Sequence, residues 1–276
     1  MVMLIKTEAI VLHSLKYGES RLIVDLFTRE HGRLSCIVGI PKTGRAKVKK
    51  QFFQPLSLID AECDVRANVR LQKIRDARML SPYVSLTYEP AKLSISLFLA
   101  EFLYHALRGE QQPDPLLFDY MRNSFLWLDT ATADFANFHL AFLMHLSRFL
   151  GFYPNITPLS VPPRGETAAP KASPRGDSEG WGGLKASPRG GLEGVFFDLR
   201  EGTFCDAPPL HQDFLRPEEA ARIHTMMRMD YQNMHLFRMS HLDRNRCLDI
   251  ILAYYRLHLP SFPELKSLPV LQELYT

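Results

Sequence analysis

The 276-residue sequence is poor in cysteine, which removes two ways of stabilising a fold. Its four cysteines are Cys36, Cys63, Cys205 and Cys247, with no CxxC pair and no Cys/His cluster around them. So scattered a set argues against a disulfide framework. A structural zinc site needs about four ligands at short paired spacings, and no such spacing is visible. We therefore expect no metal and no cofactor.

Long apolar runs are missing as well. The longest apolar segment, Leu97 to Leu107, is interrupted by Glu101 and His105, whereas a membrane-spanning helix needs about 18 or more apolar residues in a row. The N-terminus lacks the basic start, apolar run and cleavage site of a secretion signal. We expect a cytoplasmic protein that makes no membrane contact.

The usual enzyme signatures are absent too. The sequence contains no GxGxxG, GxxxxGK[ST], HExxH or GxSxG motif. His139 and His145 are six residues apart, so they do not share a helix face, and we interpret them as structural. The carboxylate cluster that a Mg²⁺-dependent nuclease needs is not visible in the basic N-terminal part. We expect no catalytic residue and no enzyme.

Positive charge, in contrast, is concentrated at one end of the chain. Residues 1–80 hold 15 Lys and Arg against 8 Asp and Glu, whereas residues 81–276 hold 18 against 22. Such asymmetry between two parts of a chain indicates that the basic part meets a polyanion.

The basic part follows the two-residue period of β-strands. Leu34, Cys36 and Val38 alternate with Arg33, Ser35 and Ile37. Turn signals separate five such runs: Leu4–Leu15, Arg21–Thr28, Arg33–Ile40, Phe52–Cys63 and Val69–Leu80. Five short strands in about 80 residues predict a small barrel, such as an OB-fold. An SH3-like barrel fits the same spacing almost as well.

After Pro82 the apolar period changes to three or four, which is typical of helices. Asp114-Pro115 predicts the start of one helix, Asp134 the cap of the next, and Ser240 with Asp243 the start of a C-terminal helix. The sequence thus predicts an α+β protein of two domains: a barrel over residues 1–80 and an all-α helical domain over residues 81–276.

One segment within the helical domain has a different composition. Residues 158–194 hold 6 prolines and 8 glycines in 37 positions, and Lys171 to Gly176 recurs as Lys185 to Gly190. Such a segment buries too little apolar surface to offset its ordering entropy, so we expect a disordered insert. A short hairpin, Val195–Asp198 and Thr203–Cys205, should follow it.

The candidate binding residues are the cations of the barrel. The connection after the third strand carries five of them within nine residues, and phosphates attract such loops through counterion release. A second group lies on the last strand pair, and two arginines flank the second and third strands. The full set is Arg21, Arg33, Lys42, Arg45, Lys47, Lys49, Lys50, Arg66, Arg70, Lys73 and Arg75. Phe52 and Phe53 are either stacking platforms for bases or members of the core.

The N-terminal motifs resemble those of the RecO family of recombination mediators. The matching residues are Thr7 to Leu12, the turn Tyr17-Gly18-Glu19-Ser20, and the run Leu26 to Leu34. The basic connection then leads through Gln54-Pro55-Leu56 into the next strand, as in that family. Further along, Arg148-Phe149-Leu150-Gly151-Phe152 is similar to the end of a family helix.

The resemblance implies an N-terminal OB-fold and a C-terminal helical domain. It implies binding to single- and double-stranded DNA, annealing of complementary strands, and help in loading the recombinase onto strands coated by single-strand-binding protein. RecR and the acidic tail of single-strand-binding protein are the partners that it implies, with a nucleoid-associated location. For the tail, Arg122 and Arg148 are candidate contacts, because an acidic, apolar-ended peptide needs a cation beside an apolar pocket.

The sequence departs from the family in one respect. Many members carry a four-cysteine zinc module after the helix that ends near Gly151, but here that place holds the Pro/Gly-rich segment, with only Cys205 nearby. The hairpin over 195–205 stands in its place.

Three other classes of protein fit parts of this pattern. An RNA-binding barrel would share the basic strands, a nuclease would cleave DNA with Mg²⁺, and a protein adaptor would carry the basic loop as a solvated surface. Preference for DNA over RNA, strand breakage and retention on DNA separate these alternatives.

Overall fold

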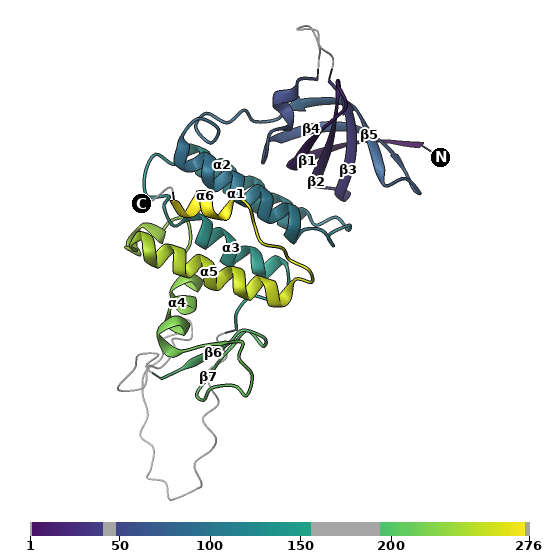
Figure 1. The fold of residues 1–276 in the computed structure, drawn as a ribbon. Coiled ribbons are helices and arrows are strands. Elements are labelled where there is room, and N and C mark those ends of the chain that lie inside the picture. The colour runs from purple at the N-terminus through teal and green to yellow at the C-terminus, as the bar shows by residue number, and fades with distance from the viewer. Residues whose placement is uncertain (1, 41–47, 156–193, 274–276) are drawn as a thin grey trace, which may run out of the picture.

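The computed structural model describes residues 2–40, 48–155 and 194–273 (Figure 1). The predicted insert over 158–194 therefore lies outside the described residues, apart from Gly194. The barrel strands are β1 (Val2–Tyr17), β2 (Arg21–Thr28), β3 (Gly32–Gly39), β4 (Leu58–Arg66) and β5 (Leu71–Met79).

The five strands pair in a ring, in the order β1-β2-β3-β5-β4, and β4 returns to β1. All these pairings are antiparallel except the one between β3 and β5, which is parallel and joins only Ser35–Ile37 to Leu71–Lys73. A five-stranded, partly open barrel is the OB-fold architecture. The pairing thus decides between the two barrels that strand spacing alone could not separate.

Alternation of side chains builds the interior of the barrel. Leu22, Val24 and Leu26 on β2 point inward with Cys36 and Val38 on β3, and all five are buried. The predicted strand over 52–63 begins later than expected. Its first residues form the 3₁₀ helix η1 (Lys50–Phe53), which packs into the core, and β4 starts only at Leu58.

The helices follow the barrel in sequence and in space. They are α1 (Pro90–Ala106), α2 (Pro115–Thr130), α3 (Phe138–Phe149), α4 (Pro217–Met227), α5 (His241–His258) and α6 (Leu268–Glu273), with the 3₁₀ helix η2 (Met234–Leu236). Asp114 caps α2 by accepting from the Leu117 N–H, and Ser240 caps α5 in the same way, as predicted. The predicted cap of α3 is wrong, because Asp134 has φ +61 and the helix begins after Asn137.

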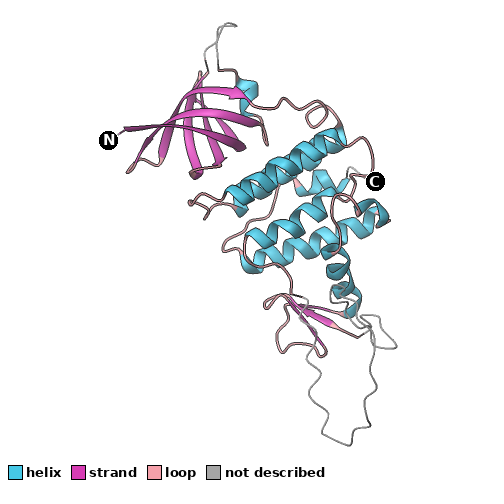
Figure 2. Ribbon diagram, turned by 180° about the vertical axis from the view of Figure 1, so that it is seen from behind, coloured by secondary structure: helices cyan, strands magenta, loops and turns pink. Residues whose placement is uncertain are grey.

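The predicted hairpin is confirmed as β6 (Phe196–Asp198) and β7 (Thr203–Cys205). A third strand, β8 (Phe214–Leu215), pairs with the other edge of β6. Figure 2 shows this small sheet beside α4 at one end of the molecule, with the barrel at the other end and the helices between them.

The barrel is docked on α1 and α2 by packing and by ion pairs. Outward-facing apolar residues of the barrel, among them Ile10, Leu12 and Phe27, belong to the same buried cluster as the helices. Arg29 and Asp119 lie 2.8 Å apart across this contact, and Arg122 lies 3.1 Å from Glu8. Opposite charges thus bracket an apolar interface.

A buried polar network fixes the link between barrel and helices. The Asp129 carboxylate accepts hydrogen bonds from the backbone N–H groups of Val84, Ser85 and Leu86. The Lys92 ammonium, only 1 % exposed, donates to Ser85 and to the carbonyl of Ala131. Lys92 thus satisfies a carbonyl at the end of α2, and the Asp129 carboxylate satisfies N–H groups of the linker, so the linker and the helix hold each other. Over the described residues, the structure contains no helix with the length and apolar character needed to span a bilayer.

Candidate nucleic-acid interface

One end of the barrel points away from the helices. The turn of the β2–β3 hairpin rests on the helical part, where the Arg33 N–H donates to Glu110. The opposite end of the same hairpin is the register pair Arg21 and Gly39. Strands of eight residues place that pair roughly 23 Å from the docked turn, at about 3.3 Å per residue. Figure 1 shows this end of the barrel on the far side from α1 and α2.

A hollow of about 230 Å³ lies at this free end, beside the turn between β1 and β2. Lys16, Arg21 and Lys50 line it together with one acid, Glu19, and with Leu22 and Ile40. All three cations are exposed, and none lies within ion-pair distance of an acid among the residues that the structure describes. Lys16 was not among the sequence candidates, although its place directly before the Tyr17-Gly18 turn was the available signal.

A second hollow, of about 470 Å³, opens where β3 and β5 separate. Its lining includes Lys73, Arg75 and Asp64. The Arg75 Nε lies 2.6 Å from an Asp64 oxygen, and this carboxylate raises the pKa of Arg75 through its hydrogen bond and its charge. Lys73 is exposed and pairs with no acid in the described part of the chain. The second hollow therefore offers one uncompensated cation and one shared cation.

The predicted cationic connection is described only at its two ends. The described chain leaves at Ile40, which lines the first, and resumes at Val48, which lines the second. Lys42, Arg45 and Lys47 lie outside the described residues, whereas Lys49 and Lys50 are exposed at their C-terminal side. Lys49 and Lys50 thus lie at the same end of the barrel as Arg21 and Lys73.

The turn between β4 and β5 carries two further candidates. Arg66 and Arg70 are both exposed there. The Gln72 side chain accepts from the Arg66 N–H at 2.8 Å and donates to its carbonyl at 3.1 Å, so the turn is held in one conformation. OB-folds bind oligonucleotides with the face of strands 2 and 3 and with the loops between strands 1 and 2 and strands 4 and 5. Cations flank both of these loops.

Three candidate arginines are placed elsewhere. Arg33 is 11 % exposed and donates to the Tyr104 carbonyl, so it joins the barrel to α1. Arg122 on α2 contacts Glu8 and Asp119, and Arg148 on α3 lies 4.1 Å from the centre of the Tyr153 ring. Each of these three side chains connects structural elements, and the structure does not bring Arg122 and Arg148 into one pocket.

The two phenylalanines after the basic connection belong to the core. Phe53 is 1 % exposed, and Phe52 is half-buried against the same interior cluster. The structure therefore selects the core interpretation over the stacking platforms.

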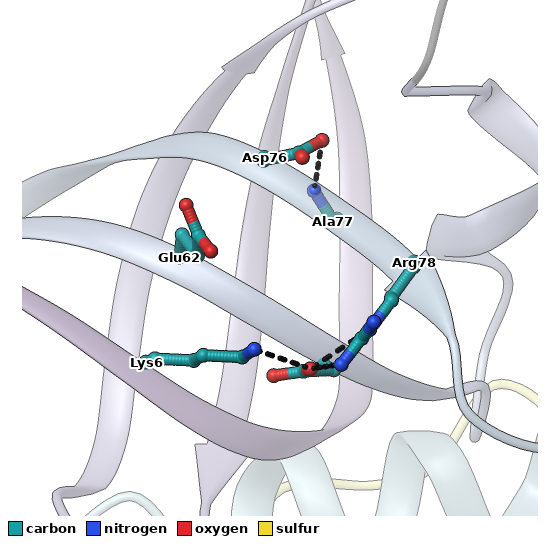
Figure 3. A pocket seen from close by; sticks show the side chains of 6 residues that line it. Lys6, Glu62, Asp76, Ala77 and Arg78 are labelled. Atoms are coloured by element: carbon teal, nitrogen blue, oxygen red, sulfur yellow. Dashed lines mark hydrogen bonds and ion pairs between the residues drawn. The ribbon is translucent and has the colours of Figure 1, made fainter.

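The opposite side of the barrel carries acidic charge. A hollow between β1, β4 and β5 is lined by Lys6, Asp60, Glu62, Asp76 and Arg78 (Figure 3). Asp60 holds both cations, at 3.5 Å from Lys6 and 2.6 Å from Arg78. Glu62 and Asp76 face each other in register across β4 and β5. With three acids against two cations, this side attracts a polyanion less than the end with Arg21 and Lys73 does.

No group of three or more His, Cys, Asp or Glu residues within 2–40, 48–155 and 194–273 is arranged to hold a metal ion. Several titratable groups with strongly shifted pKa values lie in the helical core. Burial, with the charge of Arg244, lowers the pKa of His139 to about 3. Burial also raises the pKa of Tyr231 to about 12, although its hydrogen bonds with Ser124 and Tyr120 oppose the shift. None of these groups lines a hollow of the barrel.

Comparison with known proteins gives a consistent answer over the whole chain. The model of the recombination protein O N-terminal region matches residues 1–83, and that of its C-terminal region matches residues 88–161. The DNA repair protein RecO of Phocaeicola vulgatus is 47 % identical over 274 residues, covering 99 % of this chain and 100 % of its own length. The protein of the same name from Bacteroides fragilis is 46 % identical, and that from Porphyromonas gingivalis is 31 % identical, with the same shares covered. The chain with this cationic OB-fold therefore belongs to the RecO family of DNA repair proteins.

Proposed function

We propose that this protein is a non-catalytic mediator of recombinational repair. It binds single- and double-stranded DNA, anneals complementary strands and helps to load the recombinase onto strands coated by single-strand-binding protein. Residues 1–80 are the nucleic-acid-binding domain in this proposal, and residues 81–276 are the helical domain that carries the 158–194 insert. The observation that carries the proposal is the concentration of uncompensated cations at the free end of the barrel.

The physical basis of annealing is charge neutralisation. Two complementary strands repel each other through their phosphates, and cations that neutralise those phosphates release condensed counterions. Arg21, Lys50 and Lys73 are exposed and unpaired with any described acid, so they can contact phosphates without first breaking an ion pair. Base pairing between the strands then supplies the driving force, and no bond is made or broken by the protein.

The partners proposed are RecR and the acidic tail of single-strand-binding protein, and the place is the nucleoid. Arg122 and Arg148 are proposed as contacts for the tail. Arg148 supports this because it is exposed and held over Tyr153, which presents a cation beside an aromatic ring. Arg122 is 32 % exposed and would have to share its charge with Glu8 and Asp119.

The experiment is fluorescence-anisotropy binding of a labelled single-stranded DNA oligonucleotide across a salt series without metal. The test variant carries Arg21→Ala, Lys50→Ala and Lys73→Ala. We expect it to lose affinity and to flatten the salt dependence by roughly 0.7 of a log–log unit for each lost contact on single strands. Arg216→Ala is the matched control, because Arg216 is exposed before α4 at the far end of the molecule.

The same assay distinguishes the alternatives. Equal or tighter binding to RNA of the same sequence would favour an RNA-binding barrel. Strand breakage with Mg²⁺ would contradict the non-catalytic proposal. Failure of the wild-type protein to bind DNA at low salt would leave the adaptor.

A further inference from the structure

The outward face of β1, β2 and β3 carries an apolar stripe at the free end of the barrel. Residues that pair directly across strands point to the same face of a sheet. Tyr17 pairs with Arg21, which pairs with Gly39. In the next outward row, Leu15 pairs with Ile23, Ile23 with Ile37, and Ile37 with Lys73. We call Leu15, Tyr17, Ile23 and Ile37 the outer stripe.

The outer stripe is open to solvent, unlike the rest of this face. Tyr17 is 52 % exposed and Leu15 is 55 % exposed, whereas Ile23 and Ile37 are half-buried. The following row is closed. His13 packs against Tyr104 of α1 with ring centres 4.7 Å apart and ring planes tilted by 38°, and Asp25 is 8 % exposed. The helices thus cover the face up to the stripe and leave its last two rows free.

Cations occupy both margins of the stripe. Arg21 lies beside Tyr17 in the first row. Lys73 lies beside Ile37 in the second row and pairs in register with Asp64 of β4 on its other side. The only acid on the outward face of β2, Asp25, lies one row away, where it accepts a hydrogen bond from Ser35 at 2.5 Å. An apolar and aromatic strip between cations is complementary to nucleobases flanked by phosphates.

Tyr17 is suited to hold a planar ligand. It stands at the end of β1, directly before Gly18, whose φ of +68 turns the chain back into β2. Its hydroxyl makes no hydrogen bond with another residue in the described ranges. A tyrosine so placed has about half of its surface, and its hydroxyl, available to a ligand.

Other exposed apolar strand residues do not share this setting. Val2, Met3 and Leu4 are also exposed, but their partners on β4 run from Arg66 to Asp64. That end of β4 leads into the acidic hollow of Asp60 and Glu62. The charge around Val2, Met3 and Leu4 is thus mixed, with Arg66 and Asp64 on β4, whereas cations flank the outer stripe at Arg21 and Lys73.

We propose that unpaired nucleobases pack against the outer stripe, with one base stacked on Tyr17 and the flanking phosphates held by Arg21 and Lys73. This inference rests on the proposed DNA binding and specifies its ligand as a strand whose bases are free. Bases within a duplex are stacked on each other and cannot reach the stripe, so duplex DNA is bound by its phosphates alone. Stacking on an aromatic side chain tolerates every base, which suits a protein that acts on any sequence.

The test compares an ordinary oligodeoxythymidine with an abasic oligomer of the same length, which keeps the phosphates and lacks the bases. Wild-type protein should bind the abasic strand more weakly. Tyr17→Ala should lose about five- to a hundredfold in affinity for the ordinary strand and keep the wild-type affinity for the abasic strand and for duplex. Arg21→Ala should lose affinity for all three.

Two controls keep the outcome specific. Tyr17→Phe preserves the ring and should bind the ordinary strand like wild type. Tyr88→Ala removes a tyrosine that is 78 % exposed in the linker before α1 and should change nothing. Equal losses on ordinary and abasic strands, or full affinity in Tyr17→Ala, would overturn the stacking while leaving DNA binding intact. Absence of wild-type binding to every strand would overturn the proposed function and the inference together.

Discussion

The guanidinium of Arg33 lies 4.7 Å from the centre of the Tyr104 ring and donates from Nη1 to the Tyr104 main-chain carbonyl at 2.6 Å. This contact joins β3 to α1. A cation that composition would assign to the nucleic acid thus acts in the interface between barrel and helices.

We therefore predict that Arg33→Ala weakens folding rather than DNA binding. The lost hydrogen bond and ring contact should lower the free energy of unfolding by about 2–3 kcal/mol. Arg33→Lys should recover only part of this, because an ammonium lacks the planar fork. Thermal melting and anisotropy measured below the melting range check the prediction. An unchanged melting temperature with a large loss of DNA affinity would contradict it.

Lys73 and Arg78 allow a comparison on a single strand. Both are exposed cations on β5, but Lys73 faces the outer stripe and Arg78 holds Asp60 on the acidic side. We expect Lys73→Ala to weaken DNA binding and to reduce the salt slope by roughly 0.7, whereas Arg78→Ala should leave both unchanged. Salt-dependent anisotropy of the two variants measures this difference. Equal losses in both would mean that DNA senses only the net charge of the barrel.

Gly32 and Gly18 have nearly the same backbone conformation but different surroundings. Their φ values are +63 and +68, and a Cβ at Gly32 would lie 2.6 Å from the carbonyl oxygens of Gln111 and Gln112. At Gly18 nothing lies within 4 Å. Gly18→Ala should cost only the backbone strain, about 1 kcal/mol. Gly32→Ala should cost clearly more, because the hairpin must move away from the helices. Denaturant unfolding of both variants gives the two values, and equal costs would show that the turn accommodates the methyl group.

His139 should make stability depend on pH. Burial, with the charge of Arg244, lowers its pKa from 6.5 to about 3, so the folded protein keeps the imidazole neutral. Between about pH 6.5 and 3 the unfolded chain binds a proton that the folded chain does not, so stability falls as the pH falls through this window. The expected slope approaches 1.4 kcal/mol per pH unit at its steepest.

His139→Leu is the variant that isolates this effect. It removes a buried imidazole whose Nδ1 has no hydrogen-bond partner among the described residues. The free energy of unfolding of this variant should fall less steeply than that of wild type between pH 7 and pH 5, as measured by urea titrations at several pH values. Parallel curves for the two proteins would show that another group carries the pH dependence.

Local sequence patterns predicted the elements whose cause is local. The alternation over β2 and β3 follows from one wall facing the barrel interior, and the Asp114-Pro115 pair marks the start of α2 because it supplies its own cap. Asp134 failed as a cap because the chain there takes a left-handed conformation that no short motif revealed. Phe52 and Phe53 were ambiguous because only the packing of η1 shows where their side chains point.

The candidate interface was predictable in its charge and not in its geometry. Composition located the cations within residues 1–80, but it could not separate Arg33, which packs on Tyr104, from Arg21, which faces solvent. It also missed the outer stripe. Strand register brings Tyr17, Ile23 and Lys73 together from three strands, and register is a property of tertiary pairing.

The short contact between β3 and β5 has a consequence for how the barrel folds and opens. Only residues 35–37 and 71–73 pair there, about 36 positions apart in sequence, so three pairs must offset this loop closure, whereas nine pairs offset the closure between β1 and β4. We expect it to form last in folding and to exchange its amide protons first in the native state. A DNA strand that contacts both Arg21 and Lys73 spans the short contact between β3 and β5 on the outer surface of the barrel. Its binding would slow amide exchange between β3 and β5, because the bound nucleic acid would hold these two strands together.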